Sequence, residues 1–124
     1  MTQQDVIRLW QHGAHESWIW AQKMHAEGSH ALALFHCHLS LEKKLKSLYV
    51  KTKNDTPPFS HNLGKLALDI RTDWPKKVLE DLELISPFCQ EARYGDEAWI
   101  ETIATKEFVT TILQKTEELL HVLQ

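Results

Sequence analysis

Apolar residues recur every three or four positions along nearly the whole chain, and this spacing limits the possible folds more than any other feature. No segment alternates apolar and polar residues as a half-buried strand would. A chain of 124 residues suits one domain. We therefore predict an all-α protein, an up-and-down antiparallel bundle of four to five helices in a single domain over residues 1–124.

Two long helices are predicted in the first half of the chain, over residues 5–27 and 30–52. The apolar positions of the first are Ile7, Trp10, Ala14, Trp18, Ala21 and Met24. The stripe of the second is Leu34, His38, Leu41, Leu45 and Leu48, a spacing typical of a helix packed in a bundle. Gly28 can close the first helix and Ser29 can cap the second, so we expect a tight turn between them.

A loop is predicted over residues 53–60, because Pro57 and Pro58 remove two backbone donors and fix two φ angles. A short amphipathic helix should follow over residues 61–70. Its expected buried side consists of Leu63, Leu66, Ala67 and Ile70.

The last part of the chain is expected to form two more helices. Asp73 should cap the first of them, with Pro75 tolerated in its first turn and Pro87 interrupting it before residues 88–94. Thr105 should cap the final helix. The expected inward side of that helix is Phe108, Ile112, Leu119 and Leu123.

Charge and cysteine content narrow the classes of function. The net charge is −3, whereas a broad nucleic-acid surface normally has a basic excess, so we expect only a local basic cluster. Cys37 and Cys89 are far apart and are interpreted as reduced thiols.

His36 and His38, two apart on a helix, cannot share one metal ion, and we expect no cofactor. With no signal peptide and no run of 18 apolar residues, we predict a cytoplasmic protein that does not enter a membrane.

Three short motifs resemble the signature of one known family. They are FHCHLSLEKKLKSL (residues 35–48), PPFSHNL (residues 57–63) and EARYGD (residues 91–96). A Thr-Lys-Glu-Phe helix start follows at residues 105–108. In this order and spacing, the motifs resemble the HEPN family (higher-eukaryote and prokaryote nucleotide-binding domain), and the resemblance extends from about residue 5 to residue 122.

The chain departs from the family pattern in two places. Gly95 stands where the family usually has Pro, and Ser17 stands where many members have Asp, with Glu16 beside it. Many HEPN ribonucleases place Arg four to six residues before His, but the first His after Arg93 is His121. The resemblance therefore implies a protein that is not a standard HEPN ribonuclease, and we lean against an enzyme.

One group of residues is the candidate ligand-binding site: Glu42, Lys43, Lys46, His61, Arg93 and Tyr94. The first three lie near the end of the second helix, and His61 can fold back toward them after the prolines. Such cations, with Tyr94 as a stacking surface, would suit a phosphate or nucleotide. The alternative is that Glu42 and Lys46 are an ordinary solvated ion pair at favourable helical spacing.

The resemblance implies a binding module for an ATP- or GTP-like nucleotide, associated with a nucleotidyltransferase partner in a toxin–antitoxin-like system. RNA remains an open ligand class. The alternative function is a metal-independent HEPN ribonuclease or toxin acting through an unusual pair such as Arg93 and His61. Five tryptophans exceed what a small core needs, so we also expect a homodimer.

Overall fold

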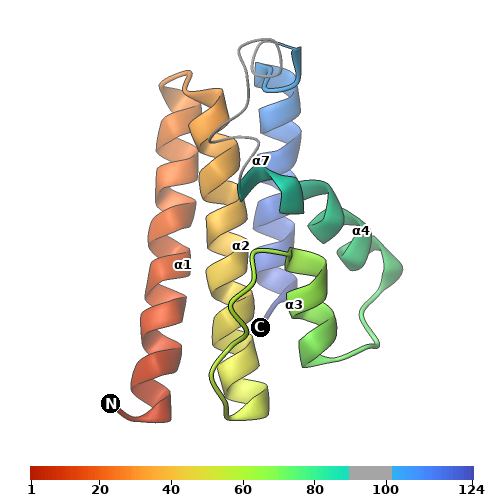
Figure 1. The fold of residues 1–124 in the computed structure, drawn as a ribbon. Helices are drawn as coiled ribbons and strands as arrows, with labels where there is room; N and C mark the ends of the chain where they lie inside the picture. Colours follow the sequence, from red (N-terminus) through yellow and green to blue (C-terminus); the bar gives the residue numbers. More distant parts are fainter. Residues whose placement is uncertain (90–101) are drawn as a thin grey trace.

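A computed structural model of the chain describes residues 1–89 and 102–124. Its elements are α1 (Gln3–Ala26), α2 (His30–Lys53), α3 (Leu63–Ile70), α4 (Lys76–Ile85), the short 3₁₀ helix η1 (Ser86–Cys89) and α7 (Lys106–Val122) (Figure 1). The described residues contain no strand. The predicted all-α helical bundle is confirmed.

The ends of the long helices follow from local chemistry. The hydroxyl of Thr2 accepts a hydrogen bond from the backbone of Asp5, whose carboxylate binds the backbone of Thr2 in return. Gly28 adopts a φ of +82°, the left-handed conformation that closes α1 as predicted. Ser29 precedes α2, but its side chain makes no capping hydrogen bond. Asn54 ends α2 in the left-handed region, at a φ of +53°.

The shorter helices differ from the prediction at their starts. The side chain of Asn62 caps α3, which therefore begins two residues later than expected. The predicted capping role of Asp73 is wrong, because Pro75 occupies the N-cap of α4 and the Asp73 carboxylate lies 3.4 Å from Nε of Arg71 instead. Thr105 caps α7 as predicted, accepting a hydrogen bond from the backbone of Phe108.

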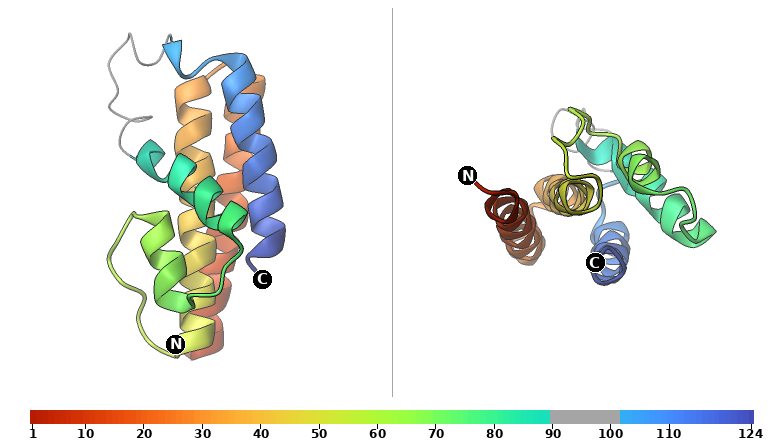
Figure 2. Two further views of the ribbon diagram at one scale, coloured as in Figure 1. Left: turned by 90° about the vertical axis from the view of Figure 1, so that its right-hand side faces the viewer. Right: turned by 90° about the horizontal axis from the view of Figure 1, so that it is seen from below.

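Helix α2 lies at the centre of the bundle. It packs against α1 and α7 on one side and against α3, α4 and η1 on the other (Figures 1 and 2). The Pro-rich loop turns at the end of α2 and climbs back alongside it, so α3 starts partway up α2 and runs in the same direction. This path brings the end of the loop beside the middle of α2.

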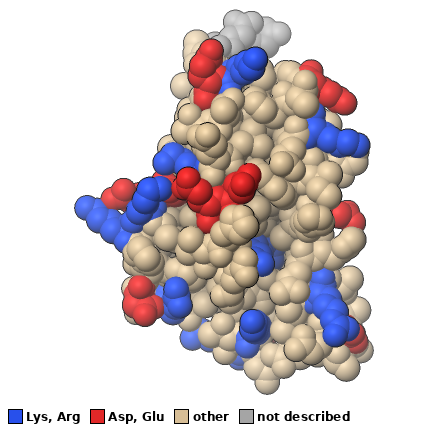
Figure 3. Space-filling model, turned by 180° about the vertical axis from the view of Figure 1, so that it is seen from behind, with Lys and Arg blue, Asp and Glu red and all other residues tan. Residues whose placement is uncertain are grey.

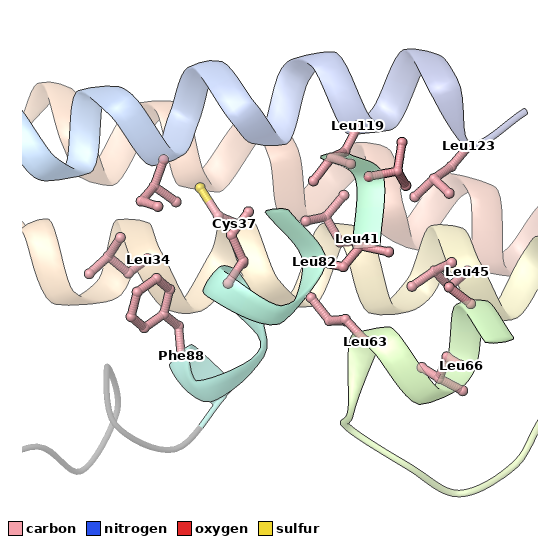
Figure 4. Packing of buried hydrophobic residues seen from close by; sticks show 14 of the residues in the cluster. Leu34, Cys37, Leu41, Leu45, Leu63, Leu66, Leu82, Phe88, Leu119 and Leu123 are labelled. Carbon is pink, nitrogen blue, oxygen red and sulfur yellow. The ribbon is translucent and has the colours of Figure 1, made fainter. Parts of the chain in front are cut away.

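The core consists mainly of leucines that α2 presents to every neighbour (Figure 4). Leu34, Leu41 and Leu45 of α2 are fully buried, and each such side chain contributes about 2 kcal/mol of hydrophobic stabilisation. They meet Leu63 and Leu66 of α3, Leu82 of α4, Phe88 of η1 and Leu119 of α7. In the described residues, no helix is both long enough and apolar enough to span a bilayer.

Candidate functional site

The carboxylate of Glu42 is the centre of the candidate site. Glu42 is 5% exposed and accepts hydrogen bonds from three side chains. Nδ1 of His61 donates to Oε1 over 2.7 Å, and Nε2 of His38 donates to the same oxygen over 3.2 Å. The ammonium of Lys46 donates to Oε2 over 3.2 Å. Two donors thus come from α2 at four-residue spacing, whereas His61 comes from the end of the Pro-rich loop.

These contacts set the charge of the carboxyl group. Burial alone raises the pKa of Glu42, because it removes water from the ionised form. Hydrogen bonds from His38 and His61, together with the charge of Lys46, outweigh burial and lower the pKa to about 2. Glu42 is therefore ionised at neutral pH, and both of its oxygens can only accept hydrogen bonds.

His38 is buried and belongs to the same network. Its Nδ1 lies 3.4 Å from the carbonyl oxygen of Ile85, so each ring nitrogen faces an oxygen that only accepts. The ring therefore links α2 to the end of α4. His38 holds the buried side of the Glu42 carboxylate in place, while His61 covers its solvent side.

His61 differs from His38 in being accessible. Its side chain is 55% exposed, so the Glu42 carboxylate fixes one edge of the imidazole while the rest of the ring faces solvent. The ring of Phe59 lies 5.9 Å from that of His61 in an edge-on arrangement. A carboxylate that orients an exposed imidazole in this way prepares it to bind an anion or to exchange a proton.

A groove of about 640 Å³ adjoins Lys46. It lies between the first half of α1, the end of α2 and the Pro-rich loop, and it is lined by Gln3, Val6, Trp10, Lys46, Val50 and residues 54–59. The Lys46 ammonium lies 5.4 Å from the centre of the Trp10 ring and 6.0 Å from that of Phe59. At these distances, a cation is attracted to an aromatic face. The groove thus has aromatic walls around one buried ammonium.

The structure brings together three of the six residues predicted for the site, Glu42, Lys46 and His61. Lys43 points elsewhere, since its ammonium binds the hydroxyl of Ser17 on α1 over 3.2 Å. Arg93 and Tyr94 lie outside the described residues.

Three members of the arrangement are not among the predicted site residues. His38 lies on a predicted core stripe, although its position four before Glu42 is a signal for contact. Trp10 belongs to a predicted helix face and Phe59 to a predicted loop. The sequence feature that could have indicated Phe59 is its position directly after two prolines. An aromatic ring in such a loop cannot pack into the core and is therefore exposed.

Metal binding has no support in the part of the chain that the structure describes. There, no three His, Cys, Asp or Glu side chains are arranged to hold an ion. The groups that a ligand could contact at this site are the buried carboxylate and ammonium, the oriented imidazole and the two aromatic rings.

Comparison with known proteins gives two matches. A model of the HEPN domain matches residues 7–124. The crystal structure of TT1696 from Thermus thermophilus is similar at a TM-score of 0.80 and 21% sequence identity, covering 94% of this chain and 94% of that chain. At this identity, the likeness shows a shared fold. No curated protein matches the chain.

Proposed function

Because this chain belongs to the HEPN domain family, we propose that it is a binding module that holds a nucleotide in the groove beside Lys46. The observation that carries the proposal is an aromatic-walled groove next to an ammonium and an imidazole that share one buried carboxylate. The volume of the groove lies within the range of about 300–1,000 Å³ typical of small-molecule sites.

The base of the nucleotide is assigned to the aromatic walls. Phe59 is 96% exposed, although exposing so large an apolar ring to water is unfavourable. A stacked base would cover this ring, and base stacking on an aromatic contributes about 1–3 kcal/mol. Trp10, which is partly buried, forms the opposite wall and contacts the same ammonium.

The phosphate is assigned to His61 and Lys46. Glu42 already neutralises Lys46, so the pair carries no net charge, and a bound phosphate gains mainly from hydrogen bonds that His61 and Lys46 donate. Lys46 can offer its remaining N–H groups, since an ammonium has three donors and Glu42 accepts one. We therefore expect modest affinity for the phosphate.

Variants of the exposed aromatic test this proposal. Phe59→Ala should weaken ATP or GTP binding about tenfold without loss of stability, because the ring touches little of the core. Leu68→Ala is the matched control, since Leu68 is 45% exposed on α3 and does not line the groove. Calorimetric titration measures both variants. Equal affinity for ATP and for inorganic triphosphate would contradict a stacked base.

Partners form a second part of the proposal. A nucleotidyltransferase, encoded nearby in a toxin–antitoxin-like pair, is the partner that the family resemblance implies, and copurification of the two proteins tests it. We also propose a homodimer. Among the described tryptophans, Trp74 is buried, whereas Trp20 is exposed. Trp20 is therefore the tryptophan that we expect a dimer interface to cover. Sedimentation as a monomer at micromolar concentration would contradict the dimer.

A metal-independent ribonuclease is the second candidate function. The observation in its favour is the 2.7 Å hydrogen bond by which Glu42 orients His61, an arrangement suited to acid–base catalysis. RNA cleavage that His61→Gln abolishes would favour it over the binding module. RNA that stays intact after prolonged incubation with the protein would exclude it.

A further inference from the structure

A second pocket lies on the face of α2 opposite to Glu42. It has a volume of about 220 Å³ and is enclosed by α1, α2 and α7. Lys44 is its contribution from α2. Position 44 lies two residues from both Glu42 and Lys46, and a rotation of about 100° per residue turns it to the far side of the helix. The pocket is therefore separate from the groove proposed for the nucleotide.

The ammonium of Lys44 forms no ion pair with another described residue. Lys44 is partly buried, yet none of the ion pairs between these residues includes it. Burial lowers the pKa of Lys44, and the positive charge of Lys51 lowers it further. Lys46 is also buried, but Glu42 neutralises it. Lys44 is thus a partly desolvated cation that forms no ion pair with a described residue.

The rest of the pocket adds donors and an apolar wall. His15 of α1 and His121 of α7 place two imidazoles around the space, and Trp18 and Leu120 line it with apolar surface. Glu117 is the one acidic side chain among the described residues that line it. Figure 3 shows this back face of the molecule, where Lys and Arg atoms are spread over its whole height and a group of Asp and Glu atoms lies near the middle.

We propose that this pocket binds a small oxyanion of the phosphate class, with Lys44 as its charge partner and His15 and His121 as flanking donors. An anion would supply a counter-charge to Lys44, and hydrogen bonds between ionised groups are about twice as strong as neutral ones. The volume lies below the roughly 300–1,000 Å³ of drug-sized sites, so the pocket suits a free anion rather than a whole nucleotide.

Titration with inorganic phosphate tests the proposal. The chemical shift of the Trp18 indole N–H, measured at constant ionic strength with chloride as the balancing ion, should report saturable binding in the millimolar range. Lys44→Gln should weaken binding at least about tenfold, because it removes the charge partner. Glu117→Gln should strengthen it about threefold, because it removes an opposing carboxylate.

Two control variants distinguish binding in this pocket from binding elsewhere on the protein. Lys23→Gln removes an exposed lysine of α1 outside the pocket and should bind phosphate like the wild type. Phe59→Ala, which tests the nucleotide groove, should also leave phosphate binding unchanged, so either site can fail independently. Equal affinity of the wild type and Lys44→Gln, or shifts that chloride alone reproduces, would overturn the proposal.

Discussion

Replacing Glu42 with glutamine should destabilise the protein by about 3 kcal/mol near neutral pH. The fold lowers the pKa of this carboxyl from its ordinary value of 4.5 to about 2. Each pKa unit corresponds to about 1.4 kcal/mol, so the folded protein favours the charged carboxylate by about 3 kcal/mol. Glutamine keeps the shape of the side chain but leaves the buried ammonium of Lys46 without its anion, a change that typically costs about 3–5 kcal/mol.

The pH dependence distinguishes this charge effect from a loss of packing. Because the pKa of Glu42 is lower in the folded state, its contribution is fully present above the unfolded pKa of about 4.5. It is lost progressively as the pH falls toward about 2, where the folded carboxyl becomes protonated. The stability difference between wild type and Glu42→Gln should therefore be largest above about pH 5.5 and shrink in acid.

Urea denaturation followed by tryptophan fluorescence measures this difference, and comparison at each pH cancels the titration of groups that do not contact Glu42. Glu80→Gln is the matched control, since Glu80 also pairs with a lysine four residues away on its helix, Lys76, but is exposed. It should change the free energy of unfolding by less than about 0.5 kcal/mol. A difference for Glu42→Gln that stays constant from about pH 6 to pH 3 would refute the reasoning.

Three further predictions concern the scaffold. Trp74→Phe should cost about 1–2 kcal/mol of unfolding free energy, because it removes the 2.8 Å bond from the indole N–H to the carbonyl of Ala67; chemical denaturation measures this. Cys37 should resist thiol reagents until the protein unfolds, since burial raises its pKa to about 12; two thiols reacting in native protein would contradict this. A Cβ at Gly13 would lie 3.0 Å from Cδ of Lys43, so Gly13→Ala should gain its full helix-propensity benefit of about 1 kcal/mol in thermal denaturation only when combined with Lys43→Ala.

Much of the fold follows from the sequence because helical periodicity is a local property. The extent of the long helices, the turn at Gly28 and the cap at Thr105 each depend on a few neighbouring residues. Asp73 fails as a cap because Pro75 fixes the backbone where α4 begins, and the competing contact with Arg71 is equally local. A sequence pattern does not predict which of two nearby partners a side chain such as Asp73 will bind.

The site is predictable only as far as spacing along one helix determines it. Glu42 and Lys46 are four residues apart, so their contact follows from the helix itself. The approach of Trp10 and Phe59 depends on how α1 and the loop pack on α2, which no residue spacing encodes. The same limit explains Lys43, whose neighbour on α1 is set by the relative rotation of two helices.

The length of the Pro-rich loop matters for the candidate site, because the loop runs back along α2. A connection that merely reversed the chain would tolerate an added residue, because only the turn would grow. Here the length of the loop determines the position along α2 at which His61 reaches Glu42. One inserted residue lengthens an extended chain by about 3.5 Å, more than a hydrogen bond can absorb. An insertion before Ser60 should therefore uncouple the imidazole from its carboxylate even if every helix stays intact.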